Sequence, residues 1–165
     1  MSYKRCSGRL RLLSKLRGSL TDAAALRIYQ AMILPIMTYA GIVKLNYNKS
    51  QLTKMTSLDN RAKEVIGTKN LPLIWNTIKK RSISVVRKCL DKDVCENFQG
   101  YFEVNTHNLC TRNSGTLLKL PKVRLEFSRS SFFYLGAKIY NELPVAIRRE
   151  ADIGAFRKLV DEHFG

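Results

Sequence analysis

Apolar residues recur at intervals of three or four positions through most of the first ninety residues. The first such series predicts an amphipathic helix over residues 4–18, because this spacing places the apolar side chains on one face. Gly18 is expected to end this helix, and Thr21 to cap the next one. The apolar series comprises Cys6, Leu10, Leu13, Leu16 and Leu20.

A second helix is predicted over residues 22–44, where the chain is apolar on nearly all sides. Such a helix contacts neighbours in several directions. Pro35 is expected to kink or interrupt it, because proline has no N–H to donate to the preceding turn. The most apolar stretch, residues 28–43, is shorter than the roughly 20 residues that a membrane span needs, so we interpret it as a core helix.

Two further helices are predicted in the first half. One runs from an N-cap at Ser50 to Gly67, and the other from near Pro72 to about Leu90. The apolar positions of the first are Leu52, Met55, Leu58, Ala62, Val65 and Ile66, and those of the second are Ile74, Ile78, Val85, Val86 and Cys89. Five basic residues are expected to face outward from the later helix: Lys79, Lys80, Arg81, Arg87 and Lys88.

The second half of the chain has a different pattern of apolar and polar residues. A polar loop at residues 105–115 precedes leucines and a valine at 117–125, which predict one or two short extended segments. Helices are expected again at residues 131–142 and 153–164. We therefore predict a mainly α fold, with a basic helical bundle in residues 1–100 and a small α+β module in residues 101–165.

The charge of the chain is strongly positive. Among 165 residues there are 29 Lys and Arg against 13 Asp and Glu, a net charge of +16 and a pI near 10.0. Residues 1–90 contain 18 of the basic residues and only three acidic ones, Asp22, Asp59 and Glu64. An excess this large usually has an anionic partner, and nucleic acid is a commoner one than a membrane surface.

The basic residues of the first half are candidate phosphate contacts. Arginine and lysine on a helix can pair with phosphates, and few acidic residues lie at helical spacing to neutralise them first. The alternative is an ordinary solvated helix face. The candidate residues are Lys4, Arg5, Arg9, Arg11, Lys15, Arg17, Lys54, Arg61 and Lys63.

No arrangement of residues suggests catalysis. The carboxylates are scattered, whereas polymerases and two-metal nucleases need them clustered, and there is no Walker loop, G-x-G-x-x-G or H-E-x-x-H motif. We predict no enzyme activity for the chain by itself and no cofactor. Zinc at Cys89, Cys95, His107 and Cys110 is disfavoured by the spacing of the first pair, so buried free cysteines are expected. No secretory signal is recognisable, which predicts a reducing, intracellular compartment.

Two stretches resemble a known family. Residues 9–46 (RLRLLSKLRGSLTDAAALRIYQAMILPIMTYAGIVKLN) and 52–67 (LTKMTSLDNRAKEVIG) resemble the thumb of reverse transcriptases from LINE-type (non-LTR) retrotransposons. Residues 107–113 (HNLCTRN), 120–148 (LPKVRLEFSRSSFFYLGAKIYNELPVAIR) and 156–160 (FRKLV) resemble the segment that follows this thumb. Leu71, Pro72 and Leu73 match a further L-P-L pattern. Tyr140 stands where the family usually has Trp, an aromatic exchange that keeps a packing role.

The resemblance implies a helical thumb that grips a template–primer duplex. The catalytic palm and the endonuclease of this family are expected to lie outside this chain, either in a longer protein or in a separate polymerase chain. The expected partner is a nucleic-acid duplex or an RNA–DNA hybrid, bound without sequence preference, and the nucleus is the favoured compartment. Arg112 and Asn113, with Thr111, are expected either to contact nucleic acid or to cap a turn.

Two alternatives remain open from the sequence. The first is a protein-interaction module whose basic surface docks an acidic partner, with the aromatic residues from Phe132 to Tyr140 as an exposed anchor. The second is an unselected relic of a transposon.

Overall fold

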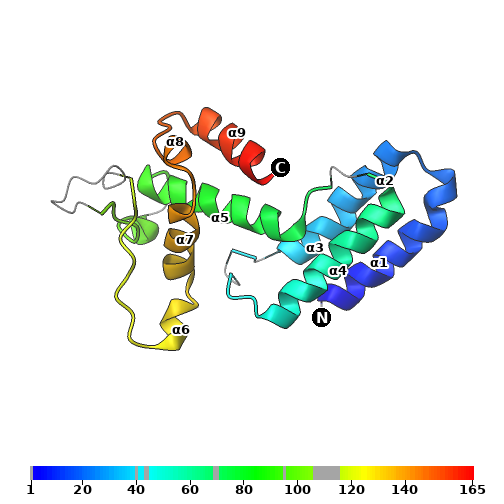
Figure 1. The fold of residues 1–165 in the computed structure, drawn as a ribbon, viewed down its shortest axis with the longest axis horizontal. Coiled ribbons are helices and arrows are strands. Elements are labelled where there is room, and N and C mark those ends of the chain that lie inside the picture. The colour runs from blue at the N-terminus through cyan, green and yellow to red at the C-terminus, as the bar shows by residue number, and fades with distance from the viewer. Residues whose placement is uncertain (1, 40, 43–44, 69–70, 95, 106–115) are drawn as a thin grey trace. The chain divides into compact units, whose positions relative to one another are not determined.

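The computed structural model describes residues 2–39, 41–42, 45–68, 71–94, 96–105 and 116–165 (Figure 1). These residues are mainly helical, which confirms the predicted fold class. They form two compact units. Unit 1 comprises Met1–Gly41 and Tyr47–Ile78, and unit 2 comprises Ile42–Asn46 and Lys79–Gly165. The division falls inside a helix, at Ile78, whereas the predicted boundary lay near residue 100.

In unit 1 two helices run in the same direction (Figure 1). The segment that lies between them in the sequence, here called the returning segment, runs in the opposite direction. The parallel pair is α1 (Ser2–Leu16) and α4 (Lys49–Ile66), and α1 packs on both α4 and the returning segment. A 3-10 turn, η1 (Arg17–Ser19), ends α1 where Gly18 was expected to end it. Cys6, Leu10 and Leu13 are buried as predicted, but Leu16 is 57% exposed.

The returning segment is interrupted, as Pro35 predicts. It consists of α2 (Asp22–Ile28), a π-helical turn η2 (Tyr29–Ile33) and α3 (Leu34–Thr38). Thr21 caps α2 by accepting a hydrogen bond from the Ala24 N–H at 3.3 Å. The segment ends at residue 38 rather than 44, because the backbone leaves the helical conformation at Tyr39, where ψ is 127°. It is not buried on all sides, since Met32 is exposed.

The cap of α4 differs from the predicted one. Asn48, not Ser50, is the N-cap, and it forms a capping box in which the Asn48 and Gln51 side chains each accept from the other's backbone N–H. Ser50 lies within the first turn of α4. Gly67 ends the helix with a left-handed φ of 76°, as predicted.

Helix α5 (Ile74–Leu90) begins in unit 1 and continues into unit 2. In unit 2 its residues Ile83 and Val86 are buried, and helices α7 (Phe132–Asn141) and α9 (Ile153–Phe164) contribute the buried Ala137, Tyr140 and Phe156. Ser131 caps α7. The shorter elements of this unit are η3 (Glu96–Phe98), α6 (Glu126–Arg129) and α8 (Val145–Arg148).

The predicted extended segments of the second half do not form a sheet. Within the described ranges there is no β-strand, and the pairing found is one antiparallel bridge between Val104 and Leu118. Asn141 holds Leu118 instead, accepting from its N–H and donating to its carbonyl at 2.8 and 2.9 Å. In the parts of the chain that are described, no helix is both long and apolar enough to cross a bilayer.

Candidate nucleic-acid interface

Helix α1 presents a basic face directly opposite its buried face. The buried side chains are Cys6, Leu10 and Leu13, and a step of about 100° per residue places Lys4, Arg11 and Lys15 on the far side. All three of these basic residues are exposed. Their spacing of seven and then four residues spreads them along about 16 Å of helix. The face therefore offers three cations in one row.

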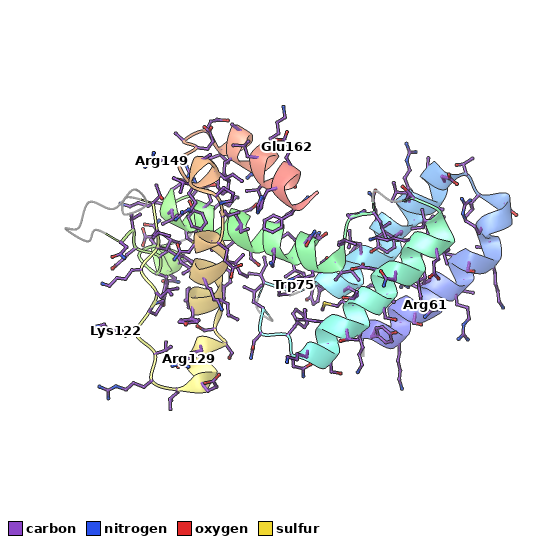
Figure 2. All side chains as sticks on the ribbon, in the orientation of Figure 1. Arg61, Trp75, Lys122, Arg129, Arg149 and Glu162 are labelled. Carbon is purple, nitrogen blue, oxygen red and sulfur yellow. The ribbon has the colours of Figure 1, made fainter. Side chains whose placement is uncertain are left out.

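Helix α4 adds two cations along the same side of α1. The Arg61 guanidinium donates to the Ser7 hydroxyl at 2.9 Å, so Arg61 lies against α1 (Figure 2). Lys54 is exposed and lies two turns earlier on the same edge of α4. Since Lys4 and Arg11 flank Ser7 on α1, these side chains share one side of the helix pair. We call this set the α1–α4 basic strip: Lys4, Arg11, Lys15, Lys54 and Arg61.

Arg5 and Arg9 lie on a different side of α1 from the strip. The Arg9 guanidinium donates to the Met32 carbonyl in η2 at 2.7 Å. The same side of α1 carries Leu12 and Leu16, which are 60% and 57% exposed and line a small cavity of about 220 Å³ together with Arg9 and Met32. The structure thus separates two residues that the sequence grouped with the strip.

The Arg17 side chain is bonded within unit 1 and is not a free cation. Its guanidinium donates to the carbonyls of Leu20 and Val65 at 2.6 and 2.9 Å and also pairs with Asp22. These bonds join the end of α1 to the last turn of α4. We therefore exclude Arg17 from the candidate site, because binding a phosphate would break contacts that hold unit 1 together.

The other predicted residues stand apart. Lys63 is half-buried on the opposite edge of α4 from Lys54 and Arg61. Arg112 and Asn113 lie outside the described residues, as do Cys95, His107 and Cys110. Cys89 is buried, as predicted. Among the described residues, no group of three or more His, Cys, Asp or Glu is placed to hold a metal ion.

The acidic residues of unit 1 do little to neutralise the strip. Asp22 is paired with Arg17, and among the described residues the exposed Glu64 forms no ion pair with a cation of the strip. Asp59 is only 5% exposed and points inward, where its two carboxylate oxygens accept from the Ile74 N–H at 3.3 Å and one accepts from the Tyr29 hydroxyl at 3.2 Å. Burial raises the pKa of Asp59 to about 6, although these hydrogen bonds and the nearby Lys63 act to lower it.

Asp59 was missed by pattern reasoning, although its position carries a signal. It follows Leu58 in the buried stripe of α4, where an acidic side chain must find donors. Its partner, the first N–H of α5, is one of the four N–H groups that a helix start leaves without a backbone acceptor. The carboxylate of α4 therefore serves as a remote cap that fixes the start of α5.

In unit 2 five of the described basic residues form ion pairs with acidic ones. Ion pairs join Lys80 to Asp161, Lys88 to Asp93, Lys119 to Glu103 and Arg129 to Glu126. Arg87 also pairs with Asp91 at 2.9 Å, donates to the Ala151 carbonyl at 3.0 Å, and lies over the Phe156 ring. The prediction that Arg87 faces outward is therefore wrong, because its guanidinium group finds its partners inside unit 2.

Arg148 is the other inward-facing arginine. It is 7% exposed, and no acceptor among the described residues lies within hydrogen-bonding distance of its Nε and Nη1. Burial lowers its pKa from the ordinary arginine value, an effect that nearby Tyr140 opposes. Tyr140 itself is 2% exposed and stacks on Phe156, so it belongs to the core and is not an exposed anchor.

Comparison with known proteins adds no relative to this picture. No protein-family model, no curated protein and no solved structure matches the chain. The candidate interface is therefore defined by its own residues: a strip of four exposed cations and the half-buried Arg61 on two helices of unit 1.

Proposed function

We propose that the chain binds nucleic acid through the α1–α4 basic strip, contacting phosphates without reading base sequence. The observation that carries this proposal is the contrast between the two units. Several lysines and arginines of unit 2 pair with nearby carboxylates, among them Lys80 and Lys119, whereas the ion pair found in the described part of unit 1 belongs to Arg17, outside the strip. Unneutralised cations in a row favour a polyanion, because binding releases its condensed counterions.

The proposed ligand is a duplex, either DNA or an RNA–DNA hybrid. Lys4, Arg11 and Lys15 are arranged in line along one helix, which suits a regular series of phosphates. The resemblance to the thumb of LINE-type reverse transcriptases supports the same function, and in that context the catalytic carboxylates would be supplied by a palm domain outside these residues. The nucleus is the compartment that fits this proposal.

The test is the salt dependence of binding. We expect the triple variant Lys4→Gln, Arg11→Gln, Lys15→Gln to bind a labelled 20-base-pair duplex more weakly and with a shallower slope of log K against log salt. Each lost phosphate contact reduces the slope by about 0.9. DNA, RNA and hybrid duplexes are titrated in parallel between about 50 and 300 mM salt, which also gives the preference among them.

The matched control removes the same charge from unit 2. Lys138, Arg157 and Lys158 are exposed in α7 and α9, and their triple Gln variant changes the net charge by the same amount. We expect this variant to keep the wild-type slope. Equal losses in the two variants would mean that only total charge matters, and no binding by the wild-type chain at low salt would refute the proposal.

A second candidate function rests on the other side of α1. The exposed Leu12, Leu16 and Met32 border the small cavity beside Arg9, and exposed apolar side chains gathered around a cavity are typical of protein-docking surfaces. The nearby Arg5 and Arg9 favour an acidic partner. A Leu12→Gln, Leu16→Gln variant separates the two functions, because duplex binding through the strip should survive it.

A further inference from the structure

One cavity in unit 2 has walls formed by three separate segments. It has a volume of about 900 Å³ and opens to solvent. Its lining comes from residues 100–103, from the extended segment 119–123, and from residues 128–133, which lead into α7. A cavity of this size falls within the range of small-molecule sites. None of these residues belongs to the α1–α4 basic strip.

One wall is a pair of parallel aromatic rings. The rings of Tyr101 and Phe133 stack with centroids 4.1 Å apart and an interplanar angle of 17°. Phe102, the next residue in the chain, is 7% exposed and packs against Phe132 in a T-shaped contact at 5.7 Å. The packing of Phe102 in the core of unit 2 therefore holds this wall of the cavity in place.

Tyr101 is the outermost ring of this cluster. It is 52% exposed, although it belongs to the same dipeptide as the buried Phe102. Gly100 has a φ of 83°, a left-handed conformation that permits the chain to turn just before Tyr101. Leu120, on the facing extended segment, is 41% exposed. The cavity thus offers a flat ring and an apolar facing side, both accessible from solvent.

Lysine supplies the charge of the cavity. Lys119 is paired with Glu103 at 3.4 Å, so these two charges largely offset one another. Lys122 is exposed on the extended segment that precedes α6 (Figure 2), and no carboxylate of the described residues forms an ion pair with it. A ligand that enters the cavity would therefore meet a stacking surface and one unneutralised cation.

We propose that this cavity binds a nucleobase that carries a phosphate, with the base stacked on Tyr101 and the phosphate near Lys122. A planar heteroaromatic ring matches the exposed Tyr101 ring, and its anionic group matches the lysine. An apolar peptide would satisfy the ring and leave Lys122 without a partner. The nucleobase can come from a free nucleotide or from an unpaired end of a nucleic acid, since the contacting chemistry is the same.

The experiment uses the full chain and three probes. AMP tests a base with a phosphate, and inorganic phosphate tests the anion alone. An unstructured oligonucleotide of about eight nucleotides tests the polymer. Binding is measured by calorimetry and by the NMR shifts of the Tyr101 and Phe133 ring protons, which move when a base stacks on them. We expect AMP or the oligonucleotide to shift these signals and phosphate alone to leave them in place.

The key variant is Tyr101→Ala, for which we expect affinity to fall about fivefold or more, since stacking on an aromatic residue contributes about 1–3 kcal/mol per base. Tyr101→Phe should retain binding, because the ring and not the hydroxyl makes the stack. Tyr39→Ala is the matched control, removing a tyrosine that is 82% exposed in unit 1. Thermal unfolding of each variant establishes that it is folded.

The outcomes separate the alternatives. Binding of AMP that depends on Tyr101 identifies a free nucleotide as sufficient, and Tyr101-dependent binding of the oligonucleotide alone identifies a polymer end. Ring signals unmoved by either base-bearing probe, or equal losses in Tyr101→Ala and Tyr39→Ala, would overturn the proposal. Because the strip variant of α1 should bind AMP normally, failure here is distinguishable from failure of the proposed duplex binding.

Discussion

At the scale of single residues, Asp59 has the most unusual environment in unit 1. It is buried between the Tyr29 hydroxyl and the first N–H of α5, and burial raises its pKa to about 6 from a value of 3.8. The folded chain therefore holds a proton on Asp59 over a pH range in which the unfolded chain has released it. Stability should fall as pH rises through this range.

We expect the contribution of Asp59 to be lost between about pH 4 and pH 6, because the ionised carboxylate pays the cost of burial at higher pH. A shift of about two pKa units corresponds to roughly 3 kcal/mol. The measurement is urea unfolding of the wild type and of Asp59→Asn at several pH values. The difference between the two free energies of unfolding should change across this window.

Glu64→Gln is the control for this experiment, since Glu64 lies on the same helix and is exposed. Its difference from the wild type should vary much less over the same range. A constant difference between the wild type and Asp59→Asn from pH 4 to 7 would show that Asp59 has an ordinary pKa.

At the scale of helices, the start of α4 shows how closely a boundary can be predicted. Asn48 and Ser50 are both good capping residues, and the sequence alone favoured Ser50. The reciprocal bonds between Asn48 and Gln51 decide the matter, because only a cap three residues before a Gln can form this box. The spacing of Asn48 and Gln51 is a signal for this box that the sequence itself contains.

We expect Asn48→Ala to destabilise the chain by about 1 kcal/mol and Ser50→Ala to change stability by a few tenths at most. Both variants remove a small polar side chain at the same end of α4, so each controls for the other. Thermal or urea unfolding measures the difference. A larger loss in Ser50→Ala would mean that the helix begins two residues later than it does in the structure.

Helices were predictable because their signals are local. Thr21 at the start of α2, Gly67 at the end of α4 and Ser131 at the start of α7 all act as their positions indicate. The early end of the returning segment at Thr38 was not predictable from periodicity, since the apolar pattern continues beyond it. The leucines near residue 118 resembled a strand by pattern, but the pairing with residues 103–105 stops at a single bridge, and Asn141 of α7 supplies the backbone hydrogen bonds of Leu118.

At the scale of the molecule, charge is divided more sharply than composition suggests. The sequence predicted a basic first half, and the structure adds which cations are free to act. Arg17 and Arg87 form internal bonds, Arg9 reaches a backbone carbonyl, and Lys4, Arg11 and Lys15 remain on an outer face. This sorting depends on tertiary contacts between residues far apart in the chain. No helical pattern contains that information.

The division of charge predicts which lysines a bound duplex should protect from chemical modification. Lysine acetylation of the free protein and of its complex, quantified by mass spectrometry, reports on each lysine separately. We expect the duplex to slow modification of Lys4, Lys15 and Lys54 several-fold. Lys138 and Lys158 are exposed in unit 2 and should react at similar rates with and without duplex.

The lysines of unit 2 make this experiment its own control, because they share the tube, the reagent and the protein concentration with those of the strip. Protection confined to Lys4, Lys15 and Lys54 requires a bound polyanion to lie along α1 and α4. Uniform protection would mean that the duplex follows net charge with no defined face, since every exposed lysine would then be shielded in proportion to the charge around it. Protection centred on Lys138 and Lys158 would place the interface in unit 2 and remove the α1–α4 basic strip from it.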